Sequence, residues 1–364
     1  MASVTLASVT KAFGKGTNVI EDLDLHVEAG ELLVLLGPSG CGKSTILRLI
    51  AGLETPTAGR ILFDDHDVTD VPTRERRVAM VQQDGSLYSH LTVRENIGFP
   101  LATRRVPRKE SDREVEAEAA HLGIRALLDQ IPSKLSAGHQ HTVATARALI
   151  QASHVLLMDE PLASLDAKIR ERTRLEIVRL HQELGNTIVY VTNDEREAMA
   201  LGDRIAVFDE SGSLRQLGIP AEVYVHPDSL FVAEFLGTMN HGTVRPEQDE
   251  HGWWLPIGND RLWLDPAIVG HRPAFSGRSE VILGIRPDHV TVAAPGTPFP
   301  ACVHGTVDRV EYAGSFATAW VTVGTWCLEA RVSPDRLPAR GNLIELTLDP
   351  RHLHFFETES GLAI

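Results

Sequence analysis

Apolar runs alternate with amphipathic stretches from the N-terminus to about Leu236. Uninterrupted apolar runs are typical of parallel strands that are covered on both faces. One of the amphipathic stretches places Ile177, Leu180 and Leu184 on a single helical stripe, and Gly185 follows as a helix stop. This alternation predicts an α/β domain with a parallel sheet. The predicted strands lie in the segments ELLVLLG, HVLLMDE, TIVYVTN and DRIAVFD.

The pattern changes after Gly237, where short β-type segments are separated by glycine and proline. Many short strands with turn signals between them predict a small all-β barrel or sandwich. We therefore expect two domains, at residues 1–237 and 238–364, with a mostly helical subdomain at about 92–150. The expected strands of the second domain lie in HGWWLPIG, RLWLDPA, EVILGIRPDHVTV, CVHGTVDRVEYAG, ATAWVTVG and LIELTLD.

Charge and composition narrow the classes of function. The 364 residues carry a net charge of −14, which opposes nucleic-acid binding because that binding depends on Lys and Arg neutralising phosphates. The longest apolar runs fall far short of the ~20 residues needed to cross a bilayer. The N-terminus lacks the apolar segment of a secretory signal, and the three cysteines have no CxxC spacing. We expect a cytoplasmic protein without a disulfide framework or a zinc site.

The sequence GPSGCGKST matches the phosphate-loop pattern GxxxxGK[ST]. A predicted strand at Leu32–Leu36 precedes it and the amphipathic run STILRLIAGL follows, so the loop would wrap phosphates at a helix N-terminus. Its glycines allow backbone N–H groups to point inward, Lys43 would reach the β- and γ-phosphates, and Ser44 would ligate Mg²⁺. The nucleotide-binding residues predicted here are Gly37, Pro38, Ser39, Gly40, Cys41, Gly42, Lys43, Ser44 and Thr45.

A second apolar run, VLLM, ends in two acids, Asp159 and Glu160. Phosphoryl transfer to water needs a carboxylate that holds Mg²⁺ and a group that orients or deprotonates the water. Two acids after a strand would, by themselves, be equally consistent with a solvated strand end. Because a phosphate loop precedes them, we assign Asp159 to nucleotide-bound metal and Glu160 to the catalytic base.

The motifs follow one another in an order that resembles the ATP-binding-cassette family. After the phosphate loop come VQQ at residues 81–83, LSAGHQ at 135–140, VLLMDEPLASLD at 155–166 and VTND at 191–194. Near the C-terminus, LGIRPDH, EYAGS and LDPRHLHFFE are similar to the accessory barrel of sugar-importer ATPases of the maltose type. The resemblance covers nearly the whole chain. It implies an α/β P-loop NTPase cassette with a helical subdomain, followed by a small OB-like barrel that pairs two subunits.

The resemblance also implies roles for residues outside the phosphate loop. Phe13 would stack on adenine, since an aromatic face can stack on any purine. Gln83 would lie near Mg²⁺ and the attacking water. It is therefore a predicted metal-site residue, with Ser44 and Asp159, and a predicted catalytic residue, with Glu160. The family places a histidine after YVT, where this chain has Asn193. A neutral amide can donate a hydrogen bond to phosphate but cannot carry a positive charge.

Other implied contacts lie across a dimer of cassettes. Ser136 and Gly138 would touch the γ-phosphate bound by the opposite subunit, and Asp166 would lie in the D-loop at the dimer interface. The family signature usually reads LSGGQ, whereas this chain has Ala137 in place of a glycine and His139 in place of the glutamine. The added methyl group would crowd the approach to phosphate.

These features predict an ATP-hydrolysing, Mg²⁺-dependent subunit of an importer, peripheral on the inner face of the cell membrane. Its expected partners are two membrane-spanning permease subunits, a second cassette that is identical or different, and indirectly an extracytoplasmic solute-binding protein. Carbohydrate is the first expectation for the solute. One alternative is a regulatory cassette that hydrolyses weakly beside a second ATPase. The other alternative is a soluble cassette protein that acts on ribosomes or DNA. The single cassette and the negative net charge disfavour it.

Overall fold

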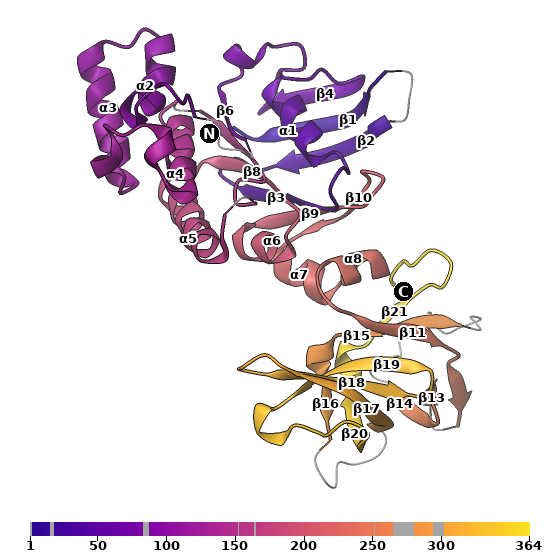
Figure 1. Cartoon of the computed structure of the whole chain (residues 1–364). Helices are drawn as coiled ribbons and strands as arrows, with labels where there is room; N and C mark the ends of the chain where they lie inside the picture. Colours follow the sequence, from indigo (N-terminus) through magenta and orange to yellow (C-terminus); the bar gives the residue numbers. More distant parts are fainter. Residues whose placement is uncertain are drawn as a thin grey trace. The chain divides into compact units, whose positions relative to one another are not determined.

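The computed structural model describes residues 2–14, 18–82, 87–151, 153–163, 165–250, 252–264, 280–293 and 302–364. The chain divides into two compact units, Met1–Val225 and His226–Ile364 (Figure 1), and each is described by itself. A functional boundary near Gly237 stays a prediction.

The centre of the first unit is a six-stranded sheet in the order β10-β9-β3-β8-β7-β6. All neighbouring pairs run parallel except β10 with β9. The four strands predicted from apolar runs are present, and β3 and β8 are buried along their whole length. Because β3, β8 and β7 are parallel neighbours, the loops that follow them open at one edge. The strands are β3 (Leu32–Leu36), β6 (Val78–Val81), β7 (Val155–Asp159), β8 (Thr187–Thr192), β9 (Arg204–Phe208) and β10 (Leu214–Gly218).

A second, antiparallel sheet has the order β2-β1-β4-β5 and shares a core with helix α1 and the central sheet. Arg76 supports the end of this helix, because its Nη1 donates to the carbonyls of Leu49 at 2.7 Å and Ile50 at 3.0 Å. Carbonyl groups in the last turn of a helix have no partner within the helix; here the Leu49 carbonyl also accepts from the N–H of Gly52 at 3.1 Å. The elements are β1 (Val4–Ala12), β2 (Asn18–Val27), β4 (Ala58–Phe63), β5 (His66–Asp67) and α1 (Lys43–Ala51).

The mostly helical segment predicted at residues 92–150 is present, and Figure 1 shows α2 and α3 grouped away from β1, β2 and β4. Its helices share an apolar core that includes Ile97, Val115 and Val143. Helix α5 ends at the predicted stop, Gly185, in a left-handed conformation. Within the described residues, no helix combines the length and apolarity needed to cross a membrane. The helices are α2 (Val93–Thr103), α3 (Arg108–His121), α4 (Ala137–Leu149), α5 (Ala167–Leu184), α6 (Glu195–Leu201) and α7 (Pro220–Val225).

The second unit contains the predicted small barrel, closed in the order β16-β19-β18-β17-β20, and two three-stranded sheets. The alternating apolar residues of the barrel strands form one buried core. Strand β19 was absent from the predicted segments. The elements are α8 (Leu230–Phe235), β11 (Asn240–Val244), β12 (Glu247–Asp249), β13 (Gly252–Ile257), β14 (Asp260–Leu264), β15 (Val281–Ile285), β16 (Val290–Val292), β17 (Cys302–Tyr312), β18 (Ala317–Val323), β19 (Trp326–Val332), β20 (Leu343–Leu348) and β21 (His354–Phe356).

Candidate functional site

The predicted phosphate loop joins β3 to α1 at the carboxyl edge of the central sheet. Gly40 and Gly42 have φ angles of 87° and 102°, which L side chains rarely adopt. Lys43 begins the helix and is 3% exposed. Its Nζ donates to the carbonyl oxygens of Gly37 at 2.8 Å and Pro38 at 2.7 Å. The ammonium group therefore lies within the turn that the loop forms, where a phosphate would approach it.

Ser44 and Asp159 meet although they are 115 residues apart. The Ser44 Oγ donates to Asp159 Oδ1 at 2.7 Å, because the start of α1 and the end of β7 lie at the same edge of the sheet. Hydroxyl and carboxylate oxygens are ligands that Mg²⁺ accepts, together with water and phosphate oxygens. Among the described residues, no cluster of three or more His, Cys, Asp and Glu could hold a metal by itself. The oxygen pair fits a cation that binds together with a nucleotide.

Glu160 and Asn193 line one hollow of about 400 Å³. Glu160 has a φ of 44°, a conformation that is costly for a residue with a side chain and that gathers at functional sites. Its N–H donates to the carbonyl of Val191 at 3.0 Å. Asn193 follows β8 and donates through Nδ2 to Ser39 Oγ of the phosphate loop at 3.3 Å. The hollow is lined by Ser39, Glu160, Ala163, Arg170, Thr192, Asn193, Asp194 and Glu197.

The predicted signature segment lies at the start of α4. Ser136 caps this helix, since its Oγ accepts a hydrogen bond from the N–H of His139 at 3.3 Å. Gly138 packs so closely on α5 that a Cβ would lie 2.6 Å from Ile169 Cγ2. Both residues line a separate hollow of about 300 Å³ that shares no residue with the Glu160 hollow. The capping and packing roles of these two residues were not predicted from the sequence.

Among the residues that the structure describes, two further residues predicted for the site, Phe13 and Asp166, line neither of these two hollows. Phe13 is 48% exposed, and Lys11 Nζ lies 4.8 Å from the centre of its ring. Asp166 caps α5, and its Oδ1 accepts from the N–H groups of Lys168 and Ile169 at 3.1 Å each. Gln83 lies outside the described residues.

Comparison with known proteins identifies both units. The ABC transporter family model matches residues 20–163 and the TOBE domain model matches residues 283–356. The sulfoquinovosyl glycerol transport ATP-binding protein SmoE of Agrobacterium fabrum is 40% identical over the full length of both chains. The chain belongs to the ATP-binding proteins of ABC transporters.

Other relatives of this ABC ATPase also match it from end to end. The sn-glycerol-3-phosphate import ATP-binding protein UgpC of Yersinia pseudotuberculosis is 40% identical over 100% of this chain and 99% of its own length. The trehalose/maltose import ATP-binding protein MalK of Thermococcus litoralis is 41% identical over all of both chains. These matches confirm the predicted family and the predicted order of a cassette and a small barrel.

Solved cassettes match about three fifths of the ABC ATPase. CbiO1 from Clostridium perfringens, part of the ABC transporter complex cbiONQ, has a TM-score of 0.57 and 29% identity over 61% of this chain and 90% of its own. The cassette MJ0796, a dimer in a post-hydrolysis state with ADP and Pi, has a TM-score of 0.54 and 30% identity over 60% of this chain and 98% of its own.

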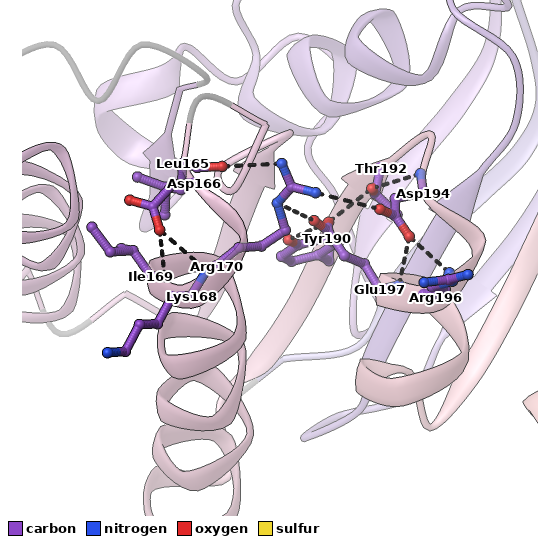
Figure 2. A network of polar contacts seen from close by, with 10 residues as sticks. All are labelled: Leu165, Asp166, Lys168, Ile169, Arg170, Tyr190, Thr192, Asp194, Arg196 and Glu197. Atoms are coloured by element: carbon purple, nitrogen blue, oxygen red, sulfur yellow. Dashed lines mark hydrogen bonds and ion pairs between the residues drawn. The ribbon is translucent and has the colours of Figure 1, made fainter. Parts of the chain in front are cut away.

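Sequence reasoning missed a polar network that includes Arg170, Asp194 and Glu197, which line the Glu160 hollow of this ABC ATPase (Figure 2). Arg170 from α5 approaches Asp194 and Glu197, and Glu197 is 5% exposed. Only Asp194 had a usable signal, because an acid that precedes a helical stretch is a typical N-cap. A buried acid inside a polar segment gives no such signal.

Proposed function

We propose that this ABC ATPase powers the import of a small polyhydroxylated solute, with a carbohydrate as the first candidate. The observation that carries the ATPase part is the edge of the central sheet, where Lys43, the Ser44–Asp159 pair and the Glu160 hollow meet. The names of the full-length relatives support the solute class, because sulfoquinovosyl glycerol, glycerol phosphate and trehalose or maltose are all rich in hydroxyl groups.

In this proposal Lys43 and the loop N–H groups hold the β- and γ-phosphates, and Phe13 stacks on adenine. Ser44 and Asp159, together with Gln83, hold Mg²⁺. When bound, this ion offsets charge on the phosphate oxygens. Glu160 accepts a proton from the attacking water, and Asn193 donates a hydrogen bond to a γ-phosphate oxygen.

The cassette would work as a head-to-tail dimer at the cytoplasmic face of the membrane. Ser136 and Gly138 of one subunit would meet the nucleotide held by the other, and Asp166 would lie at their interface. This arrangement is supported by the separation of the two hollows, which share no lining residue within one chain. Two permease subunits would form the pore, and a solute-binding protein would deliver the solute to them.

Uptake by the assembled transporter tests the solute class. The chain would be reconstituted in vesicles together with candidate permease subunits and a candidate solute-binding protein. We expect ATP-dependent accumulation of labelled maltose, trehalose or sn-glycerol-3-phosphate, and no accumulation of a labelled amino acid. Rapid ATP hydrolysis with uptake of the amino acid alone would contradict the solute class. Absence of hydrolysis would instead favour the alternative of a regulatory cassette that hydrolyses weakly. Asn193, Ala137 and His139, which depart from the family motifs, are consistent with that alternative.

Replacing Asn193 with histidine is expected to raise kcat for ATP by about tenfold or more, because an imidazole can hold the γ-phosphate more strongly than an amide. The loss of one transition-state donor typically costs a factor of ~10²–10³, so its gain would be readily measured. Steady-state hydrolysis would be measured for Asn193→His alone and together with Ala137→Gly and His139→Gln. Asn342→His, at an exposed position of the second unit, is the control. A slower Asn193→His enzyme would show that the asparagine is already an effective donor.

A further inference from the structure

One guanidinium group lies between the segment that follows Glu160 and the turn that contains Asn193 (Figure 2). Arg170 is in the first turn of α5. Its Nη2 donates to the carbonyl of Leu165 at 3.0 Å. On its other side, Nη1 lies 3.9 Å from Asp194 Oδ2 and Nε lies 4.0 Å from Glu197 Oε1. Arg170 is therefore bonded to one segment and within ion-pair distance of two acids in another.

Those two acids fix the turn at residues 192–194. Glu197 Oε2 accepts hydrogen bonds from Tyr190 Oη at 3.0 Å and from Thr192 Oγ1 at 2.9 Å. Thr192 Oγ1 in turn accepts from the N–H of Asp194 at 3.0 Å. Asp194 also caps α6. Asn193 is held between two residues that both belong to this network.

Charge makes Arg170 important to this network. Burial raises the pKa of Glu197, and the nearby Asp194 carboxylate raises it further, whereas hydrogen bonds from Thr192 and Tyr190 and the charge of Arg170 lower it. A carboxylate that is largely removed from water needs hydrogen bonds and a cation to remain ionised. Arg170 provides the charge and the hydroxyl groups provide the hydrogen bonds.

We propose that Arg170 is a positioning residue that couples segment 165–166 to the turn at residues 192–194, so that the place of Asn193 in the hollow depends on that segment. The inference rests on the proposed role of Asn193 in hydrolysis. A guanidinium is a rigid planar fork, so a displacement of Leu165 changes the direction in which Arg170 faces both acids. If Asp166 lies at the interface with a second cassette, binding of that cassette changes the position of Asn193 through the contacts of Arg170.

Steady-state ATP hydrolysis by the full chain tests the coupling. We expect Arg170→Ala to lower kcat by about 10- to 100-fold, the effect of a small misplacement in a site, while KM for ATP changes less than about twofold because the phosphate loop is untouched. Arg170→Lys keeps the positive charge but not the planar guanidinium, so its kcat should lie between that of the wild type and that of Arg170→Ala. The matched control is Arg174→Ala, one turn along α5, where the arginine pairs only with the exposed Glu171 at 2.6 Å among the described residues.

A double-mutant cycle separates positioning from general stability. If Arg170 acts through Asn193, Arg170→Ala will change kcat less than twofold in an Asn193→Ala background, whereas independent effects would multiply. Glu197→Gln should reproduce the loss seen in Arg170→Ala, which supplies a second route if the arginine variant unfolds. Wild-type kcat in Arg170→Ala and Arg170→Lys, or multiplied losses in the cycle, would overturn the coupling. A wild-type chain that hydrolyses no ATP would instead contradict the proposed function.

Discussion

Replacing Lys43 with alanine is expected to lower kcat for ATP hydrolysis by at least about 100-fold and to abolish solute uptake. The Lys43 ammonium group is buried in the phosphate loop, bonded to the carbonyls of Gly37 and Pro38. In that place it can offset the charge of the β- and γ-phosphates as charge shifts in the transition state. Removal of one such preorganised donor costs a factor of ~10²–10³ in comparable sites. Hydrolysis and binding of a fluorescent ATP analogue would be measured together.

The fold should survive the Lys43 substitution, because the ammonium group loses only its hydrogen bonds to two loop carbonyls and a long contact with Cys41 Sγ at 3.7 Å. A typical hydrogen bond contributes about 0.5–1.5 kcal/mol to stability, so the midpoint of thermal unfolding should fall by only a few degrees. Lys109→Ala, at an exposed position of α3, should retain wild-type turnover. Wild-type turnover by Lys43→Ala would contradict the assignment of the phosphate loop.

The sequence predicted four of the six strands of the central sheet, because β3, β7, β8 and β9 consist mainly of continuous apolar runs, whereas β10 contains polar residues and is only partly buried. The order of the strands in the sheet places the loops after β3, β7 and β8 at one edge. Motifs that are far apart in the sequence therefore lie close together in the candidate site. Strand β19 was missed although Leu328, Ala330 and Val332 alternate with polar residues and are buried. Strict alternation of apolar and polar residues is the signal of a half-buried strand. The charged residues in this short segment made that signal harder to see than a continuous apolar run.

The residues proposed for the phosphate loop, and Asp159, could be selected from the sequence because each belongs to a contiguous motif with a known physical task. The Ser136 cap could also have been found, since a serine immediately before a helix is a typical N-cap. The contact of Arg170 with Glu197 could not, because it joins residues from two elements and depends on how deeply the acid is buried. Pairing across elements is a property of the packed fold.

Glu160→Gln is expected to lower kcat by about 10²–10⁴-fold, the usual contribution of general acid–base catalysis, while ATP binding is retained. The amide has nearly the shape of the carboxylate, so the strained backbone and its hydrogen bond to Val191 should persist. An amide cannot accept a proton from water. If Glu160 is the base, the nucleotide stays intact and keeps two cassettes together.

Size-exclusion chromatography with Mg-ATP therefore provides a second measurement for Glu160→Gln. We expect the variant to elute as a stable dimer in ATP and as a smaller species in ADP, whereas the wild-type dimer should dissociate as ATP is consumed. Glu171→Gln, at an exposed position of α5, should behave like the wild type in both measurements. Wild-type kcat in Glu160→Gln would exclude Glu160 as the base. A loss of hydrolysis without dimer retention would show that the base acts but that hydrolysis does not control separation of the cassettes.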